Sequence, residues 1–506
     1  METPGAVEMF PSLTHESHAG DRWNPYHEFY KDDFQPRLHY KPLWEQIQRA
    51  GQNALASKAR EAHLALHAEG VTFTVYSDKD QGIERVWPFD VIPRIITAAE
   101  WLQIEAGLKQ RVRALNLFLK DLYHGQRVIK DGVIPAELIY KGKDFRREIM
   151  DVDVPGDIYT HISGIDLIRD DNGRYLVLED NLRTPSGVSY MIENRILERR
   201  ILPEFFTQYR VRRVEHYPQL LLQALRHVSP RGKESAEIVV LTPGIYNSAY
   251  FEHTFLAREM GVELAEGRDL AVKNNIVYLK TTRGLRRVDV IYRRVDDDFL
   301  DPLCLREDST LGIAGVINAW RAGNVALVNA PGSGIADDKA VYAYVPAIIR
   351  YYLGEQPILQ NVPTYQMTNP DHAAYVLDHL DCMVVKAVAE SGGYGMLMGP
   401  SATPALRAQF AAKVKEDPRN YIAQPVVPLS RHVCYLDGEL ESRHIDLRPY
   451  IIYGQEIEVV PGGLTRVALT KGSLVVNSSQ GGGSKDTWVL ADPSAVAFGE
   501  GASEAV

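Results

Sequence analysis

Apolar and polar positions follow two different periods along the chain, and each period predicts one kind of element. Over residues 101–122, apolar residues recur every three or four positions, which predicts an amphipathic helix. Thr97 and Glu100 form the pattern of a capping box just before it. Alternation at residues 71–75 predicts a strand. The first 70 residues are expected to be mainly helical.

A β-hairpin is predicted for residues 162–187, and its polar positions are the most informative in the chain. Two apolar runs flank Asp-Asp-Asn-Gly at residues 170–173, and these residue types tolerate the positive φ of a tight turn. Asp166 interrupts the first run, whereas Glu179 and Asn181 follow the second and share one strand face. Strand pairing would gather them into a set of hard oxygen ligands suited to Mg²⁺. The alternative is a hairpin whose acidic residues are only solvated.

Residues 236–335 are predicted to alternate strands and helices, which is typical of a mainly parallel, doubly wound sheet. Ligands of such sheets bind at the carboxyl ends of strands. Arg293 and Arg294 follow one such end, so we expect one of them to bind a substrate carboxylate, which a guanidinium matches. An ion pair with residues 296–298 is an equal alternative. The expected strands are residues 238–241, 289–292 and 325–328.

A lysine and a glycine-rich loop follow a predicted strand in the last third of the chain. Lys386 ends an apolar run, and residues 387–395 read AVAESGGYG before a second short strand. The loop matches neither the Walker nor the Rossmann phosphate pattern. It can still act as a flap whose amides cover a triphosphate while Lys386 neutralises charge. The alternative is a purely structural glycine hairpin.

Another predicted strand, residues 443–448, places His444, Asp446 and Arg448 on one face. Arg448 pointing into a polyphosphate site is one interpretation, because guanidinium groups bind phosphate well. A strand with one solvated face is the other. The sequence Gln-Pro-Val-Val, which begins at Gln424, is expected to be a short strand leading to a crossover.

Composition and charge narrow the class of protein. The 506 residues carry a formal net charge of −10 without a large basic block, which argues against nucleic acid or an anionic membrane as the main partner. Cys304, Cys382 and Cys434 lie far apart, which fits a reducing compartment. The N-terminal stretch lacks the apolar core of a signal peptide, and no apolar run reaches the length of a membrane span. We therefore expect a cytoplasmic protein.

Together these parts resemble the ATP-grasp superfamily. Because the acidic set precedes Lys339 and Lys386, their order resembles the circularly permuted branch of glutathionylspermidine-synthase-like proteins. The resemblance covers most of the chain, roughly residues 71–490. The runs that carry it are ERVWPFDVIPRII, LEDNLRTPSGVSYMIENR, DVIYRRVDDDFLDPL, NAPGSGIADDKAVYAYVP and NSSQGGGSKDTWVL.

The resemblance implies ATP and Mg²⁺ as cofactors and gives a role to each matching residue. Asp166, Glu179 and Asn181 match the Mg²⁺ ligands. Lys339 and Lys386 match the lysines that contact the nucleotide phosphates, and Lys386 is also a catalytic candidate. The remaining matches belong to the phosphate flap, to the linker that reads adenine and to the catalytic contact with the γ-phosphate. In that order they are Ser391, Gly392 and Gly393, then Gln424 and Val426, and then Arg448.

The implied fold is a circularly permuted ATP-grasp fold of the α/β (α+β) class, with a doubly wound α/β domain. The expected divisions are a helical extension (1–70), a part with the metal hairpin (71–235), a substrate domain (236–335), a part with the lid and closing strands (336–492) and a flexible tail (493–506).

The implied activity is ATP-driven ligation of a small-molecule or peptide carboxylate to an amine. The carboxylate would form an acyl phosphate and ADP, and the amine would then displace phosphate. A nucleotide-binding module without catalysis and a phosphotransferase are the alternatives. Better-known bifunctional members carry an amidase domain with an N-terminal catalytic cysteine. No cysteine here lies in such a place, so no amidase half is expected.

Overall fold

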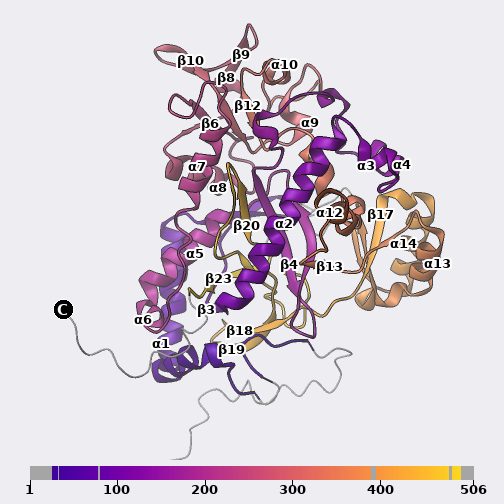
Figure 1. Cartoon of the computed structure of the whole chain (residues 1–506). Helices are drawn as coiled ribbons and strands as arrows, with labels where there is room; N and C mark the ends of the chain where they lie inside the picture. Colours follow the sequence, from indigo (N-terminus) through magenta and orange to yellow (C-terminus); the bar gives the residue numbers. More distant parts are fainter. Residues whose placement is uncertain (1–24, 32–33, 78–79, 389–394, 478–480, 492–506) are drawn as a thin grey trace, which may run out of the picture.

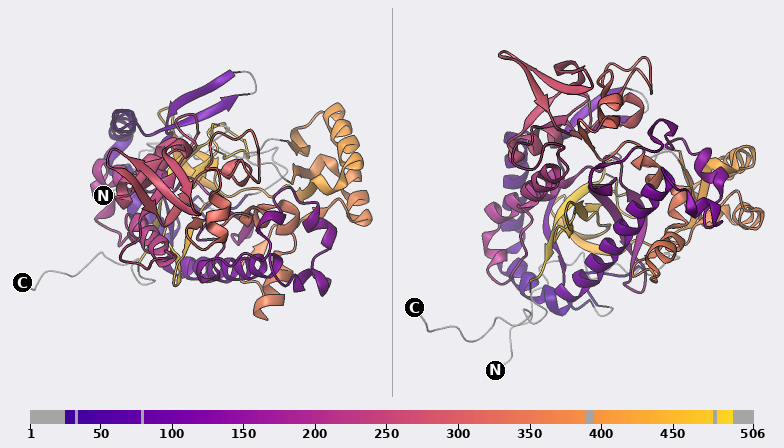
Figure 2. Two further views of the ribbon diagram at one scale, coloured as in Figure 1. Left: turned by 90° about the horizontal axis from the view of Figure 1, so that it is seen from above. Right: turned by 45° about the horizontal axis from the view of Figure 1, so that its top comes forward.

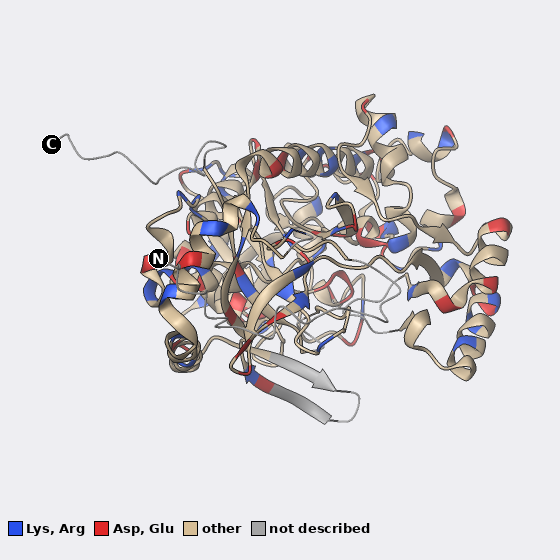
Figure 3. Cartoon of the chain, turned by 90° about the horizontal axis from the view of Figure 1, so that it is seen from below, with Lys and Arg blue, Asp and Glu red and all other residues tan. Residues whose placement is uncertain are grey.

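The computed structural model describes residues 25–31, 34–77, 80–388, 395–477 and 481–491. Helices and several sheets are mixed throughout, which confirms the α/β (α+β) class (Figure 1). No described helix is long and apolar enough to cross a membrane. Lys and Arg are interspersed with Asp and Glu in the view of Figure 3 rather than gathered by sign.

The central sheet contains the predicted hairpin. β4 pairs with β5 so that Asp166 lies opposite Glu179 and Gly164 opposite Asn181. Gly173 closes the turn with a φ of +75°, a conformation that glycine adopts without strain. Along the sheet the strands are β13 (Gln360–Asn361), β5 (Tyr175–Asn181), β4 (Ile162–Arg169), β20 (Tyr450–Tyr453) and β21 (Ile457–Val459).

The long helix α2 (Ala98–Leu122) runs past this sheet (Figure 1). Its buried residues, which include Ile104 and Leu108, pack in one cluster with Ile165 and other sheet residues. The predicted capping box is confirmed, because Thr97 accepts from the Glu100 amide at 3.3 Å and Glu100 accepts from the Thr97 amide at 3.0 Å.

Smaller sheets lie beside the central one, and α1 (Lys41–Ala68) packs against them as the predicted N-terminal helix. Figure 2 shows the hairpin of β1 and β2 extending away from the rest of the molecule. The strands are β1 (Thr72–Ser77) with β2 (Asp80–Val86), β18 (Arg431–Leu436) with β19 (Glu439–His444), and β22 (Thr465–Val467), β23 (Gly483–Val489) and β3 (Phe89–Ile96).

A separate parallel sheet confirms the predicted strand–helix alternation. An antiparallel meander that was not predicted is inserted before β11. The parallel strands are β12 (Ala326–Val328), β11 (Val290–Arg293), β6 (Ile238–Leu241) and β7 (Glu263–Ala265), and the meander is β8 (Leu270–Lys273), β9 (Ile276–Thr281) and β10 (Gly284–Val288).

A four-stranded antiparallel sheet with two helices lies at the right of Figure 1, and we call it the lid. It has its own apolar core, which includes Val385, Leu397 and Phe410. Its elements are β14 (Tyr365–Gln366), β17 (Tyr421–Pro425), β15 (Met383–Ala387), β16 (Met396–Met398), α13 (Pro370–Asp378) and α14 (Pro404–Glu416).

The other helices connect these sheets. They are α3 (Arg127–Lys130), α4 (Ala136–Tyr140), α5 (Val188–Ile201), α6 (Pro203–Phe206), α7 (Tyr217–His227), α8 (Tyr250–Met260), α9 (Asp297–Leu300), α10 (Val316–Arg321), α11 (Lys339–Tyr342) and α12 (Val345–Leu353).

Candidate functional site

Two cavities meet at the end of β5. The lid cavity, of about 140 Å³, lies between the lid sheet and the central sheet. The loop cavity, of about 300 Å³, lies over the segment Arg183 to Gly187 that links β5 to α5. Residues of both cavities form one continuous site, because four side chains line both. They are Glu179, Lys339, Arg466 and Asn477.

The lid cavity has apolar walls and one charged end. Its walls come from both sheets, so a flat apolar group can be enclosed between them. The charged end contains Asp166, Glu179, Lys339 and Lys386. The apolar wall residues include Ile168, Leu178, Val362, Val384, Met396, Met398 and Leu474.

Lys386 is held in place by a chain of hydrogen bonds. Its Nζ donates to Gln424 Oε1 at 2.7 Å, and Gln424 Nε2 donates to Thr364 Oγ1 at 3.0 Å. Burial lowers the pKa of the Lys386 ammonium to about 8, and Glu179 opposes this shift. A phosphate at this end of the cavity would favour the charged form of Lys386 again.

The two predicted linker residues are both buried beside this cavity. Gln424 supports Lys386, as described above, whereas Val426 lines the wall. The Val426 amide donates to the Cys382 carbonyl at 3.2 Å and is therefore already engaged. The predicted flap residues Ser391, Gly392 and Gly393 lie outside the described residues.

Asp166 is clamped between two arginines. The Arg448 guanidinium binds both of its carboxylate oxygens, with Nη2 2.7 Å from Oδ2. Arg466 Nη2 also donates to Oδ2 at 2.7 Å, and its Nε donates to Asp446 at 2.9 Å. Burial alone raises the pKa of Asp166, but Arg448 and Arg466 outweigh it and hold this pKa well below its usual range. Asp166 is thus ionised.

Gly164 makes room for this clamp. A Cβ on Gly164 would come within 3.1 Å of Pro185 Cβ and 3.3 Å of Arg448 Cδ. Such distances are tight, so a larger residue would displace the arginine or the loop. Because Gly164 on β4 has no side chain, the Arg448 side chain can lie flat over the hairpin.

Glu179 and Asn181 fit a magnesium ion. Glu179 Oε1 is 3.8 Å from Arg448 Nη2 and its side chain is 29% exposed, so its carboxylate can still accept a ligand. Asn181 lines the loop cavity, and its amide oxygen is the atom that could bind the ion, whereas its buried Nδ2, a donor without a hydrogen-bond partner in the described part of the chain, suits a phosphate oxygen. Asp166 Oδ1 accepts from Arg448 Nε, and a carboxylate oxygen has a further lone pair that can bind a ligand.

The described residues contain no group of three His, Cys, Asp or Glu side chains that could hold a metal by themselves. Magnesium does not require one, because it usually takes one or two carboxylates and completes its shell with phosphate and water. The oxygen donors of Asp166, Glu179 and Asn181 suit this coordination preference of magnesium.

Arg293 and Arg294 lie outside both cavities. Arg293 is buried, donates to the carbonyls of Asn329 and Val295 at 2.7 and 2.9 Å, and pairs with Asp297 at 2.6 Å. Its geometry favours the ion-pair alternative over a substrate contact. Arg294 donates to the Pro185 carbonyl at 2.8 Å and so supports the loop beneath the loop cavity.

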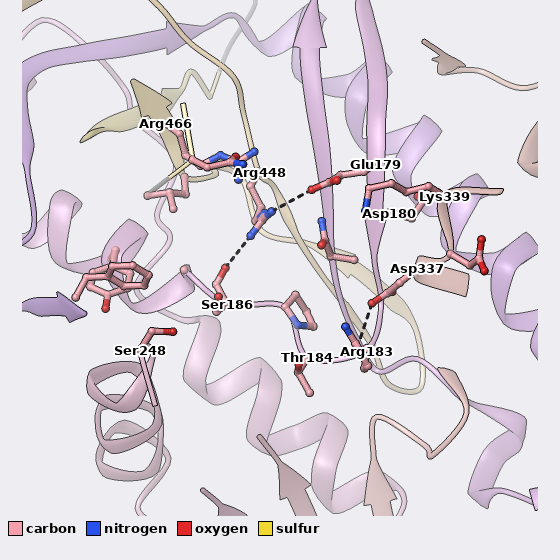
Figure 4. Close-up of a pocket in the computed structure, with 18 of the residues that line it drawn as sticks. Glu179, Asp180, Arg183, Thr184, Ser186, Ser248, Asp337, Lys339, Arg448 and Arg466 are labelled. Atoms are coloured by element: carbon pink, nitrogen blue, oxygen red, sulfur yellow. Dashed lines mark hydrogen bonds and ion pairs between the residues drawn. The ribbon is translucent and has the colours of Figure 1, made fainter. Parts of the chain in front are cut away.

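Several residues of the site were not identified from the sequence. Arg466 joins Asp166 to Asp446, and no local pattern around it announces that role. Asp337 precedes Lys339 in GIADDK, and both residues line the loop cavity, although the sequence pattern indicates only the lysine. Figure 4 shows Asp337 with Arg183 on one side of Arg448 and Ser248 on the other.

The chain matches the circularly permuted ATP-grasp type 2 family over residues 93–468. The protein belongs to this family. One relative is an uncharacterized protein from Synechocystis sp.. It is 53% identical to this ATP-grasp protein over 93% of this chain and 98% of the relative's own length. An uncharacterized relative from Mycobacterium tuberculosis is 49% identical over 92% of this chain and 84% of its own length.

A Frankia alni protein provisionally named a glutamate–cysteine ligase is 42% identical over 93% of this chain but only 54% of its own length. Among solved structures, a glutathione synthetase-like effector from Globodera pallida in its apo form has a TM-score of 0.54 at 11% identity. That match covers 87% of this chain and 98% of the effector. The effector shares the fold, and the family match confirms the resemblance drawn from the sequence.

Proposed function

We propose that this ATP-grasp protein is an ADP-forming ligase that joins a carboxylate to an amine through an acyl phosphate. One observation carries the proposal: an apolar cavity whose charged end includes Lys339 and Lys386 opens onto a second, polar cavity at Glu179 and Lys339. The adenosine would occupy the lid cavity. Its phosphates would then lie at the junction, next to the loop cavity where the acid and the amine meet.

The residues at the junction would act mainly by position and charge, as phosphoryl transfer requires. Lys386 and Lys339 would bind the phosphates, and Arg448 would face the phosphoryl group being transferred. Asp166 holds Arg448 in that orientation and, with Glu179 and Asn181, would hold Mg²⁺. When bound, that ion neutralises phosphate charge and orients the phosphate oxygens.

Ligation is favoured over simple nucleotide binding because the described residues at the junction include the charged groups that phosphoryl transfer would need. Both arginines, both lysines and the three metal-ligand candidates are present within or beside the two cavities. The name of the Frankia alni relative also describes a ligase. Because the match covers about half of that protein, its substrates are not carried over.

The test is acid-dependent trapping with hydroxylamine. Purified protein is incubated with ATP, Mg²⁺, hydroxylamine and pools of amino acids, N-acetylamino acids and short peptides. A ligase that activates a carboxylate will release ADP and form the matching hydroxamate, which mass spectrometry identifies. The control is the same reaction with Mg²⁺ removed by chelation.

Two results would contradict the proposal. ADP release that yields a stable phosphorylated product and no hydroxamate would indicate a phosphotransferase. Binding of a non-hydrolysable ATP analogue without turnover of any pool would favour a nucleotide-binding module.

A further inference from the structure

An arginine of the lid is bonded to the residue just before Lys339. Arg419 lies two positions before the lid strand β17, and its Nη2 donates to Asp338 Oδ2 at 2.7 Å. The same nitrogen donates to the carbonyl of Leu138 on α4 at 2.8 Å. In Figure 1, α4 accordingly lies beside the lid. One side chain therefore holds the start of β17 against two elements outside the lid.

Asp338 uses its two carboxylate oxygens for different bonds. Oδ1 caps α11, because it accepts from the Ala340 amide at 2.8 Å, whereas Oδ2 accepts from Arg419. The helix that it caps begins at Lys339, which lines both cavities. The Asp338 side chain is only 3% exposed, so contacts on both oxygens fix its orientation. The position of Lys339 is therefore tied to that of Arg419.

The strand β17 also holds the other phosphate-binding candidate. Gln424 on β17 accepts from Lys386 Nζ at 2.7 Å, and Ile422 on β17 packs in one apolar cluster with Ala340 of α11. Burial is the main cause of the lowered pKa of Lys386, and the charge of Lys339 adds to it. The two ammonium groups are therefore near enough to repel each other. An attachment between the lid and α11 opposes this repulsion.

The surrounding residues pack closely around the Arg419 guanidinium. A Cβ on Gly142 would come within 3.2 Å of Arg419 Nη2 and 2.8 Å of Ile335 Cδ1, so a side chain there would displace them. Arg419 Nε is buried without a hydrogen-bond partner in the described part of the chain, which is unfavourable. A buried ion pair adds little net stability, because lost hydration offsets the attraction. The orientation that the bond fixes explains the arrangement better than added stability does.

We propose that Arg419 is a positioning residue, which holds the lid against α11 so that Lys386 and Lys339 bind the phosphates of the same nucleotide. The proposal rests on the ligase function proposed above and concerns how that ligase binds ATP. Arg419 is not among the described residues that line either cavity, so it acts through Asp338 and through Gln424. Loss of its bond should leave both lysines present but no longer placed for one ligand.

Substitutions at both ends of the bond, with one control, separate the bond from the packing around it. Arg419→Ala removes the guanidinium, whereas Arg419→Lys keeps its charge. Asp338→Asn leaves one oxygen to serve both the helix cap and Arg419. Tyr344→Phe is the matched control. Tyr344 Oη donates to Gln366 Oε1 of β14 at 3.2 Å, so it also joins the lid to the rest of the molecule, through a bond that does not involve Asp338.

The first measurement is calorimetry with adenosine and with a non-hydrolysable ATP analogue in Mg²⁺. Arg419→Ala should lower the affinity for the analogue about three- to tenfold, less than the loss of a phosphate contact itself, while adenosine affinity stays within about twofold. Arg419→Lys should lie between Arg419→Ala and the wild type, and Tyr344→Phe should match the wild type with both ligands. Equal losses for both ligands in Arg419→Ala would indicate a disrupted lid and overturn the positioning role.

The second measurement is a double-mutant cycle between Arg419 and Lys339, which a merely structural arginine would not affect. In the wild type, Lys339→Ala should lower the affinity for the ATP analogue about tenfold, the lower end of the range for a charged hydrogen bond. In the Arg419→Ala background the same substitution should lower it by less than about threefold, because Lys339 is already misplaced. In the Tyr344→Phe background the full loss should remain. Equal losses in every background would overturn the proposal.

Asp338→Asn tests the same bond from its other end and serves even if Arg419→Ala folds poorly, since it keeps the shape of the side chain. It should also reduce the effect of Lys339→Ala, and an undiminished effect would contradict the positioning role. Failure of the wild type to bind the ATP analogue would refute the nucleotide site and with it the proposed function. Binding with additive losses would refute only the role of Arg419.

Discussion

The lid cavity and the loop cavity share a wall at Glu179, but they satisfy their charged groups in opposite ways. In the lid cavity, Lys386 donates to Gln424 at 2.7 Å, and Gln424 is itself anchored. In the loop cavity, Asp144 and Arg183 are 3.5 Å apart and form no full hydrogen bond. A prearranged group binds its ligand with little reorganisation, whereas loosely paired groups must be reordered when a ligand binds. The contrast predicts that substitutions of the prearranged groups in the lid cavity lower ATP affinity, each by an amount that depends on the hydrogen bond it removes.

The largest effect is expected at the shared wall. Glu179→Ala should lower the rate of Mg²⁺-dependent ADP release about 100-fold or more, because loss of a metal ligand or of its supporting residue typically reduces activity by this factor or more. It should also abolish the Mg²⁺-dependent part of the thermal shift caused by a non-hydrolysable ATP analogue. Glu458→Ala, at an exposed position on β21 of the same sheet, is the control. Unchanged turnover in Glu179→Ala would remove Glu179 from the site.

The next effect separates the two ends of the lid cavity. Lys386→Ala should weaken ATP binding about 10- to 100-fold, the range for a hydrogen bond to a charged group, while adenosine binding stays within about twofold. Calorimetry with each ligand measures the difference. Lys413→Ala, at an exposed position on the lid helix α14, should change neither. Equal losses for ATP and adenosine in Lys386→Ala would show that the lid itself had been disrupted.

A smaller effect concerns pH. The pKa of Lys386 is lowered to about 8, chiefly by burial, so the free protein loses this charge as the pH rises through 8. Phosphate favours the charged lysine, so ATP affinity should be highest below pH 8 and fall by up to about tenfold per pH unit above it. ATP binding above pH 8 should therefore take up a proton, which calorimetry in two buffers detects. A profile that persists in Lys386→Ala would assign it to another group.

The contrast between the cavities also explains what sequence alone can predict. Local patterns were sufficient for the turn at Gly173, for the capping box at Thr97 and for Lys386 at the end of its strand. Each depends on residues a few positions apart. The predicted strand end at residue 292 was correct to within one residue, because β11 ends at Arg293.

Long-range contacts decided what the sequence did not show. Arg293 turns toward the carbonyls of Asn329 and Ala330, which belong to a segment after another strand. Arg466 meets Asp166 across 300 positions of sequence. Likewise, the loop cavity brings together Asp144, Arg183 and Asp337 from three separate segments of the chain. A single sequence does not specify which distant side chains fill one cavity.

The smallest expected effect tests whether the lid cavity is truly prearranged. Gln424→Leu removes the acceptor that holds the charged Lys386, so ATP affinity should fall about three- to tenfold, less than in Lys386→Ala. Because the lost bond favours the ammonium form, the pH at which ATP affinity starts to fall should move below 8. Gln424→Glu adds a negative charge at the same place and should move it upward. Thr364→Val, which removes only the support of Gln424, should lie between wild type and Gln424→Leu. If the two substitutions at Gln424 moved the midpoint in the same direction, the hydrogen bond would not set the state of Lys386, and the prearrangement would lie in the apolar walls instead.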